Sequence, residues 1–200
     1  VSDCTRDTDT TAYANVLLPA AGWGEKDGTV TNSERRISRQ RPFLSAPGEA
    51  RADWRIICDV AIRMGYAGFD YASAAEVFRE HAELSGFEND GRRDFDISAL
   101  AALDDGAYDA LAPVQWPVTS EHPAGTPRMF ESQAFFTPDR KARFVPVVPR
   151  AARNATSRDF PLVLNTGRVR DQWHTMTRTG KTGRLLSHIF EPYAEFHPED

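Results

Sequence analysis

Residues 160–180 constrain this chain most, because an apolar run there leads directly into a loop rich in ligand-binding residue types. Residues 160–164 are apolar and predict a strand. Residues 165–180 contain three arginines, four threonines, a histidine and a tryptophan, with Gly167 at the expected strand exit. A hydrophobic core has no use for this mixture, whereas a polyanionic ligand with a planar ring does. Arginine binds phosphate through paired hydrogen bonds, and glycine lets the backbone come close to it.

Two simpler interpretations of this loop were considered. Taken alone, residues 166–168 also suit a solvated loop with a turn glycine, since a lone glycine motif has little specificity. Residues 180–182, Gly-Lys-Thr, end as a phosphate-binding Walker loop does, but Thr175 stands where that motif requires its first glycine. We therefore exclude a Walker loop and leave the solvated loop open.

The composition narrows the functional class. The hydrophobic fraction of 40 % is ordinary for a globular chain, and the net charge of −5 provides no basic field for nucleic acid. No apolar run approaches the roughly 20 residues that a membrane helix needs. Cys4 and Cys58 are too far apart in sequence to suggest a pair of metal ligands, and their spacing fits a reducing compartment. We therefore expect a cytoplasmic protein with no nucleic-acid partner and no membrane span.

The apolar pattern predicts a mixture of helices and strands. Residues 52–64 carry apolar residues at helical spacing, and Ser73 with Glu76 forms a capping box that begins a second helix. The buried face of the first helix is expected to contain Trp54, Ile57, Cys58, Ala61 and Ile62. Shorter elements are expected as a helical turn at 9–14, a strand at 15–19, turns at 27–28 and 104–106, a helix at 96–103 and a hairpin at 129–145.

The string from Asn165 to Gly180 resembles the cofactor-binding segment of the molybdenum oxidoreductases that carry bis-molybdopterin guanine dinucleotide. In that family a Thr-Gly-Arg turn leads through Trp-His-Thr into a threonine-rich loop, and residues 168–180 look most like assimilatory nitrate reductase. The resemblance runs along nearly the whole chain. Asn15 stands where the family usually has aspartate, which puts a salt bridge at that position in doubt.

The resemblance implies an α/β fold in three parts. Residues 1–145 would form the C-terminal part of a Rossmann-like parallel-sheet domain with its connector and hairpin. Residues 146–159 would be a linker, and residues 160–200 would begin a β-barrel of the double-psi type. Because the chain begins with valine and carries neither the family's four-cysteine motif nor its molybdenum ligand, we expect an internal fragment that is inactive alone.

The resemblance also implies which residues bind the cofactor. Thr166, Gly167 and Arg168 would hold pterin and phosphate groups. Beside the metal, the pterin would meet Gln172, Trp173, His174 and Thr175.

Asp3 stands apart from this loop, near the start of the chain. In the family a Ser-Asp pair at this point contacts a guanosine of the cofactor, whereas the residue type alone suggests a cap or a turn. Within these 200 residues we expect no catalytic residue and no metal ligand.

The activity that the resemblance implies is the two-electron reduction of nitrate to nitrite in nitrate assimilation. Electrons would come from a donor protein or a reductase subunit through a 4Fe–4S cluster in the N-terminal part that this fragment lacks. Two alternatives stay open: a formate dehydrogenase-like member of the same superfamily, and a non-catalytic nucleotide-binding module.

Overall fold

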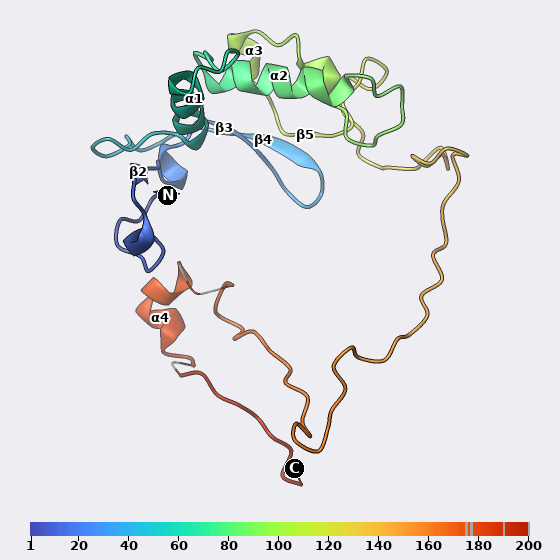
Figure 1. Cartoon of the computed structure of the whole chain (residues 1–200). Coiled ribbons are helices and arrows are strands. Elements are labelled where there is room, and N and C mark those ends of the chain that lie inside the picture. Colours follow the sequence, from blue (N-terminus) through green and yellow to red (C-terminus); the bar gives the residue numbers. More distant parts are fainter. Residues whose placement is uncertain (175, 177, 190, 200) are drawn as a thin grey trace. The chain divides into compact units, whose positions relative to one another are not determined.

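The computed structural model describes residues 1–174, 176, 178–189 and 191–199, and it divides into two units, residues 1–144 and 145–200 (Figure 1). The first unit is a mixed α/β structure with one small parallel sheet and one small antiparallel sheet. The second is mostly irregular chain with one short 3₁₀ helix and one short α-helix. None of the helices in the described residues is long and apolar enough to cross a membrane.

The parallel sheet joins the start of the chain to the predicted strand at 15–19. β1 (Ser2–Asp3) pairs in parallel with β2 (Leu18–Pro19), with Ser2 opposite Leu18. The strand is therefore confirmed, but it is shorter than expected and Leu17 is exposed rather than buried. Between the two strands lies the 3₁₀ helix η1 (Thr11–Tyr13), which is the predicted helical turn.

The antiparallel sheet has the order β3-β4-β5, with β3 at Gly28–Thr31, β4 at Arg36–Gln40 and β5 at Val114–Gln115. The hairpin between β3 and β4 turns at residues 32–35, where Arg35 has a φ of 68°. The prediction of a turn at 27–28 was wrong, because Gly28 already pairs with Gln40 in the sheet. The 3₁₀ helix η2 (Trp23–Glu25) precedes β3.

The two long predicted helices are confirmed as α1 (Asp53–Arg63) and α2 (Ala74–Gly86). α2 begins where Ser73 Oγ accepts a hydrogen bond from Glu76 N at 3.3 Å. The predicted helix at 96–103 is the 3₁₀ helix η3 (Ser98–Leu100). The expected turn at 104–106 instead begins α3 (Asp105–Asp109).

The buried face of α1 matches the predicted one in part. Cys58 and Ala61 are buried as predicted, whereas Ile57 is 61 % exposed and Ile62 is 49 % exposed, and Ile56 is buried instead. Apolar residues lie on more than one side of this helix, so their spacing predicted the helix correctly without identifying the side that packs.

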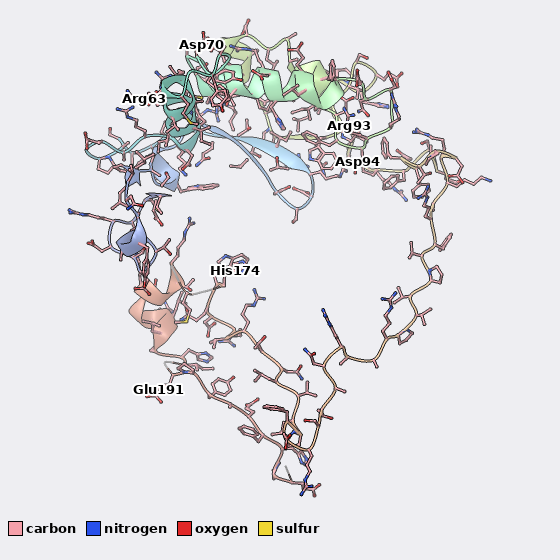
Figure 2. The ribbon with its side chains drawn as sticks, viewed as in Figure 1. Arg63, Asp70, Arg93, Asp94, His174 and Glu191 are labelled. Carbon is pink, nitrogen blue, oxygen red and sulfur yellow. The ribbon has the colours of Figure 1, made fainter. Side chains whose placement is uncertain are left out.

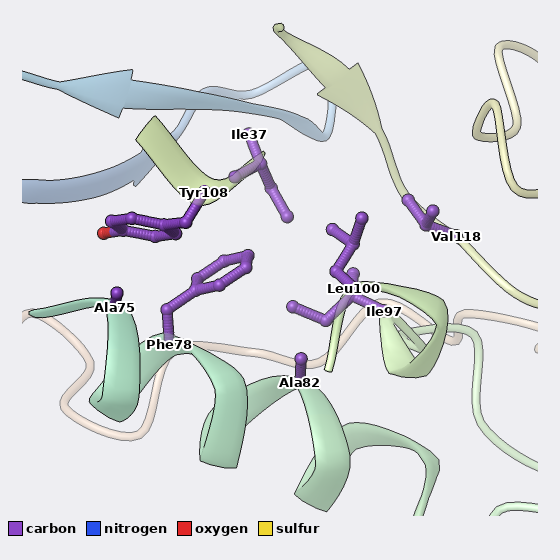
Figure 3. Packing of buried hydrophobic residues seen from close by; sticks show 8 residues of the cluster. All are labelled: Ile37, Ala75, Phe78, Ala82, Ile97, Leu100, Tyr108 and Val118. Atoms are coloured by element: carbon purple, nitrogen blue, oxygen red, sulfur yellow. The ribbon is translucent and has the colours of Figure 1, made fainter. Parts of the chain in front are cut away.

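The core of the first unit lies where α2 packs against β4 and the chain around η3 (Figure 3). Phe78 of α2 contacts the Tyr108 ring at a centroid distance of 5.3 Å, and Ile37 of β4 is buried in the same cluster. Over Tyr108 lies the guanidinium of Arg39, which also forms ion pairs with Asp27 and Asp109. This packing fixes the antiparallel sheet on α2.

Three strands predicted in the later half of the chain do not form. Residues 160–164 form no strand, and Phe160 and Leu164 are exposed. The backbone of Phe160 bonds locally to Ser157, and no described strand pairs with the run. Within 129–145 the expected turn is present, with Arg140 N donating to Thr137 O, but the flanking strands are absent. The 3₁₀ helix η4 (Thr179–Lys181) and α4 (Gly183–Leu186) are the regular elements of the second unit.

Replacing Phe78 with alanine should lower the free energy of unfolding by about 3–5 kcal/mol, since it leaves a cavity beside Tyr108. Urea denaturation followed by tryptophan fluorescence measures the change. The control Phe144→Ala removes a ring that is 94 % exposed and should change the free energy by less than about 0.5 kcal/mol. Equal losses in the two variants would contradict this account of the core.

Candidate cofactor site

The loop at 165–180 is tied to the segment after α4 by one carboxylate. Asp171 Oδ2 lies 2.6 Å from His188 Nδ1, and Arg170 donates to both oxygens of Asp171 from Nε and Nη2 at 3.1 and 3.2 Å. The interaction joins residues 17 apart in sequence and so closes the intervening chain into a ring. Asp171 is partly buried, with 23 % of its side chain exposed.

The charges around Asp171 favour its ionised form. Hydrogen bonds from Arg170 are the main cause that lowers the pKa of the carboxyl group, and the charges of Arg170 and His188 add to them. Partial desolvation opposes these effects without reversing them. At pH values above the ordinary pKa of aspartate, the Asp171 carboxylate is therefore ionised and stabilises the loop. This stabilisation is lost as the pH falls through the lowered pKa of Asp171.

Inside this ring the backbone makes a compact turn. Trp173 N donates to Thr179 Oγ1 at 3.1 Å, and Gly180 N donates to Met176 O at 2.9 Å. His174 has a φ of 48°, and its ring meets the Trp173 ring edge-on at 4.5 Å between centroids. In Figure 2 His174 and Glu191 mark the two ends of the segment that contains α4.

Gln172 is the buried polar residue of this loop. It is only 5 % exposed, and within the part of the chain that the structure describes neither its Oε1 nor its Nε2 has a hydrogen-bond partner. A buried amide without partners costs on the order of 1–3 kcal/mol. The cost disappears if a ligand supplies one donor and one acceptor at this position.

The first part of the predicted site is open to solvent. Thr166, Gly167 and Arg168 are exposed, and no atom would lie within 4 Å of a Cβ added at Gly167. Arg168 lies over the Trp173 ring at 5.9 Å, and no carboxylate among the described residues pairs with its guanidinium. Thr175, also predicted to bind the cofactor, lies outside the described residues.

Asp3 belongs to the first unit, whereas the other candidates belong to the second. Asp3 Oδ1 accepts a hydrogen bond from Thr5 N at 2.8 Å, directly after β1. The turn role that its residue type suggested is therefore confirmed. The contact with a guanosine stays a prediction.

Outside the loop, the described residues form hollows but no metal site. Within the part of the chain that it describes, no group of three or more His, Cys, Asp or Glu side chains could hold a metal ion. Two hollows lie in the first unit, with volumes of about 640 and 280 Å³. Arg93 and Asp94, labelled in Figure 2, help to line the larger one. Neither hollow is lined by a residue of the predicted site.

The sequence did not identify Asp171 as an organising residue. In the structure Asp171 pairs with His188. The two lie far apart in sequence, so no local spacing could indicate their contact. The one available signal was the Arg170-Asp171 pair itself, which places a carboxylate inside an otherwise basic loop.

Asp171→Asn should speed amide hydrogen exchange over residues 169–188 by about two- to fivefold at pH 7, the range that an exposed ion pair supplies. The difference from the unmodified chain should shrink as the pH is lowered through the depressed pKa of Asp171. Hydrogen-exchange mass spectrometry, corrected for the intrinsic exchange rates of the two sequences, measures the difference in exchange rate. Asp159→Asn, in the same unit and with no ion pair to any residue that the structure describes, should have no effect. An effect equal to that of Asp171→Asn would refute the tie.

Comparisons with known proteins point to the same enzyme family that the loop at 165–180 resembles. Residues 1–63 match the molybdopterin oxidoreductase family. The chain is 53 % identical to a nitrate reductase from Klebsiella oxytoca over 201 residues, which are 100 % of this chain and 23 % of that protein. It is 36 % identical to the assimilatory nitrate reductase catalytic subunit of Bacillus subtilis (strain 168), covering 96 % of this chain and 26 % of that protein.

A formate dehydrogenase is also similar. The F420-dependent formate dehydrogenase subunit alpha of Methanocaldococcus jannaschii is 34 % identical, over 96 % of this chain and 27 % of that protein. The chain thus spans about a quarter of the length of these curated relatives. Residues 1–63 are thus similar to the molybdopterin oxidoreductase family, and the whole chain is similar to about a quarter of each of these nitrate reductases.

Proposed function

We propose that these 200 residues are part of a molybdenum-dependent nitrate reductase and supply part of the shell that binds bis-molybdopterin guanine dinucleotide. The observation that carries the binding role is Gln172, whose buried amide has no partner among the described residues. The similarity to nitrate reductases at up to 53 % identity supports nitrate as the substrate.

The residues of the loop suit different parts of such a ligand. The exposed Gly167 lets a phosphate approach the backbone, and Arg168 has a guanidinium without a carboxylate partner among the described residues. Gln172 offers a donor and an acceptor to a heterocycle edge, and Trp173 and His174 offer ring surfaces. Thr166 and Thr175 belong to the proposed shell through the family resemblance.

Asp3 is the proposed contact to a guanosine. Its carboxylate follows β1, and the carboxyl ends of parallel strands are where open α/β sheets bind ligands. Oδ1 accepts one hydrogen bond, from Thr5 N, which leaves acceptor capacity on the carboxylate for a base or a ribose.

The residues of this chain would bind and orient the cofactor. When bound, the molybdenum cofactor supplies the oxygen-atom transfer and the two electrons that convert nitrate to nitrite. We assign no bond-breaking step to any side chain here, since groups of this kind position a cofactor and tune its electronics. A 4Fe–4S cluster outside these residues, a donor protein or reductase subunit, and a cytoplasmic location complete the proposal.

The finer fold assignment is also a proposal. The parallel pairing of β1 and β2, with α1 following, suits a Rossmann-like domain over residues 1–145. Residues 146–159 would be a linker and residues 160–200 the start of a double-psi β-barrel, whose strands would need neighbours outside the described chain.

A formate dehydrogenase is the second candidate. The 34 % identity to the F420-dependent formate dehydrogenase subunit alpha, over 96 % of this chain, favours it specifically. The larger identity to the Klebsiella oxytoca nitrate reductase over the full chain places nitrate first.

Replacing the matching segment of the Klebsiella oxytoca nitrate reductase with residues 1–200 should give an enzyme that holds molybdenum and reduces nitrate with a reduced dye as electron donor. Metal analysis and a nitrite assay measure the two properties. The same chimera with Gly167→Val and Arg168→Gln should lose at least about tenfold in cofactor content, because two charge-assisted hydrogen bonds and the close backbone approach are lost. A chimera that is loaded with molybdenum but oxidises formate and not nitrate would refute the nitrate assignment.

Gln172→Leu separates ligand binding from folding. In the 200-residue chain it should leave amide exchange over residues 169–188 unchanged or slower, because it removes a buried amide that has no partner. In the chimera it should lower molybdenum content. Faster exchange in the isolated chain would indicate a structural role for the amide and contradict the ligand role.

A further inference from the structure

The larger hollow of the first unit has a volume of about 640 Å³, and the cofactor role proposed for the second unit does not use it. Pockets that bind small organic molecules typically measure about 300–1,000 Å³, so this hollow has the size of a ligand site. It is lined by the C-terminal half of α2, by residues 92–95 and by Phe136. We call it the α2 hollow.

Aromatic and apolar side chains form the walls of the α2 hollow. The rings of His81 and Phe95 lie 5.4 Å apart between centroids, with 33° between their planes. Phe136 and Leu84 add further apolar surface, and Leu84 is 58 % exposed although it lines a concave site. Exposed rings around a hollow favour a ligand that carries a planar apolar ring of its own.

The wall that contains Phe136 is fixed to the turn before residues 92–95. Arg140 donates from Nη1 to Gly91 O at 2.7 Å, and its guanidinium lies over the Phe136 ring at 5.6 Å from the centroid. Phe136 also meets the Phe130 ring edge-on, at 6.1 Å between centroids. These contacts hold the Phe136 ring in place in the absence of a ligand, so the hollow is already formed.

The lining of the α2 hollow carries charges of both signs. Arg93 donates from Nη2 to Ser85 O at 3.1 Å and to Phe87 O at 2.7 Å, which fixes its guanidinium. Its Nε and Nη1 donate to no described residue. Asp94 accepts a hydrogen bond from Phe95 N through Oδ1 at 2.8 Å, and no described residue bonds to its Oδ2. Arg93 and Asp94 are consecutive (Figure 2), and no ion pair joins these two described residues.

A second arginine of the lining is already engaged. Arg92 Nη2 lies 2.9 Å from Asp90 Oδ2, so its charge is paired outside the hollow. The charged groups left for a ligand are therefore the fixed guanidinium of Arg93 and the carboxylate of Asp94. The imidazole of His81 also makes no hydrogen bond to any described residue, which leaves a neutral polar group beside the rings.

This combination selects a ligand that carries both charges. A guanidinium binds a carboxylate through charge-assisted hydrogen bonds, and a carboxylate oxygen accepts such a bond from an ammonium group. A simple anion would leave Asp94 without a partner, and a simple cation would leave Arg93 without one. A small molecule with a carboxylate, an ammonium group and a planar ring matches both the charges and the walls.

We propose that the α2 hollow binds an aromatic α-amino acid. Arg93 binds its carboxylate, Asp94 binds its ammonium group, and its ring packs on Phe95 and Phe136. The inference goes beyond the proposed function and does not depend on it, because every residue that it uses belongs to the first unit.

Titration of the 200-residue chain with L-phenylalanine, followed by ligand-detected nuclear magnetic resonance, tests the proposal. Three analogues each lack one part of the ligand: phenylethylamine has no carboxylate, 3-phenylpropionate has no ammonium group, and L-alanine has no ring. Each should bind at least about tenfold more weakly than L-phenylalanine, because each loses either a charge-assisted hydrogen bond or the contacts of the ring.

Variants of the two charged residues should change the preference among these ligands. Asp94→Asn should weaken L-phenylalanine binding by at least about tenfold without weakening 3-phenylpropionate, which has no ammonium group to lose. Arg93→Gln should weaken L-phenylalanine and 3-phenylpropionate but not phenylethylamine. The matched control Glu88→Gln removes one negative charge near the same turn without lining the hollow, and it should change L-phenylalanine binding by less than about twofold.

Asp94→Asn decides the question, because asparagine keeps the Oδ1 acceptor for Phe95 N and so keeps the local structure. No binding of L-phenylalanine by the unmodified chain would overturn the proposal, and so would equal effects of Asp94→Asn and Glu88→Gln. Binding of 3-phenylpropionate as tight as that of L-phenylalanine would overturn the amino-acid class, since the ammonium contact would then contribute nothing.

The chimera with the Klebsiella oxytoca enzyme tests the site in a full-length protein. L-Phenylalanine should bind the chimera and the 200-residue chain with affinities within about threefold of each other, whether or not the chimera holds molybdenum. A chimera that reduces nitrate but does not bind L-phenylalanine would show that another segment covers the hollow. That result would overturn this inference and leave the proposed function intact. A chimera that binds L-phenylalanine but holds no molybdenum would have the opposite meaning.

Discussion

Backbone hydrogen bonding decides which apolar runs of this chain become strands. β1 exists because β2 runs beside it, and β4 exists because β3 and β5 satisfy its two edges. Residues 160–164 are at least as apolar, yet no described strand pairs with them and they form no strand. The same requirement explains why the first unit holds the sheets while the second is organised by side-chain contacts.

In the first unit, arginine side chains donate hydrogen bonds to carbonyl groups that no neighbouring strand pairs with. The Arg35 guanidinium donates to Trp116 O and, at 3.0 and 3.1 Å, to Thr126 O and Pro127 O. In the same turn Arg36 pairs with Glu34. Arg35 instead holds the turn of the hairpin to the chain after β5. The Arg35 side chain therefore fixes the position of the hairpin turn, a role that the residue type alone does not indicate.

Short-range sequence patterns predicted the local structure well, whereas contacts between residues far apart in sequence determined the rest of the fold. Ser73 and the spacing of apolar residues identified α2, because a helix cap and a helical apolar face both depend on residues that are close together in sequence. Ile57 was placed on the buried face of α1 and is exposed, because the side of a helix that packs is set by contacts with residues from elsewhere in the sequence. The loop at 165–180 was identified from composition and resemblance, but its closure by Asp171 and His188 was not, since that contact joins two separate segments.

The position of Asp171 divides the cations of the loop into two groups with different roles. One carboxylate engages Arg170 and His188, and both of these then serve to close the ring. Arg168, on one side of this pair, keeps its guanidinium over Trp173, and Arg178 and Arg184, on the other side, keep theirs without a partner among the described residues. A single acid placed next to the first arginines therefore separates cations that hold the protein from cations that are available to an anion. Moving that acid by a few residues would exchange the two groups, which is why its position carries more information about the ligand than the number of arginines does.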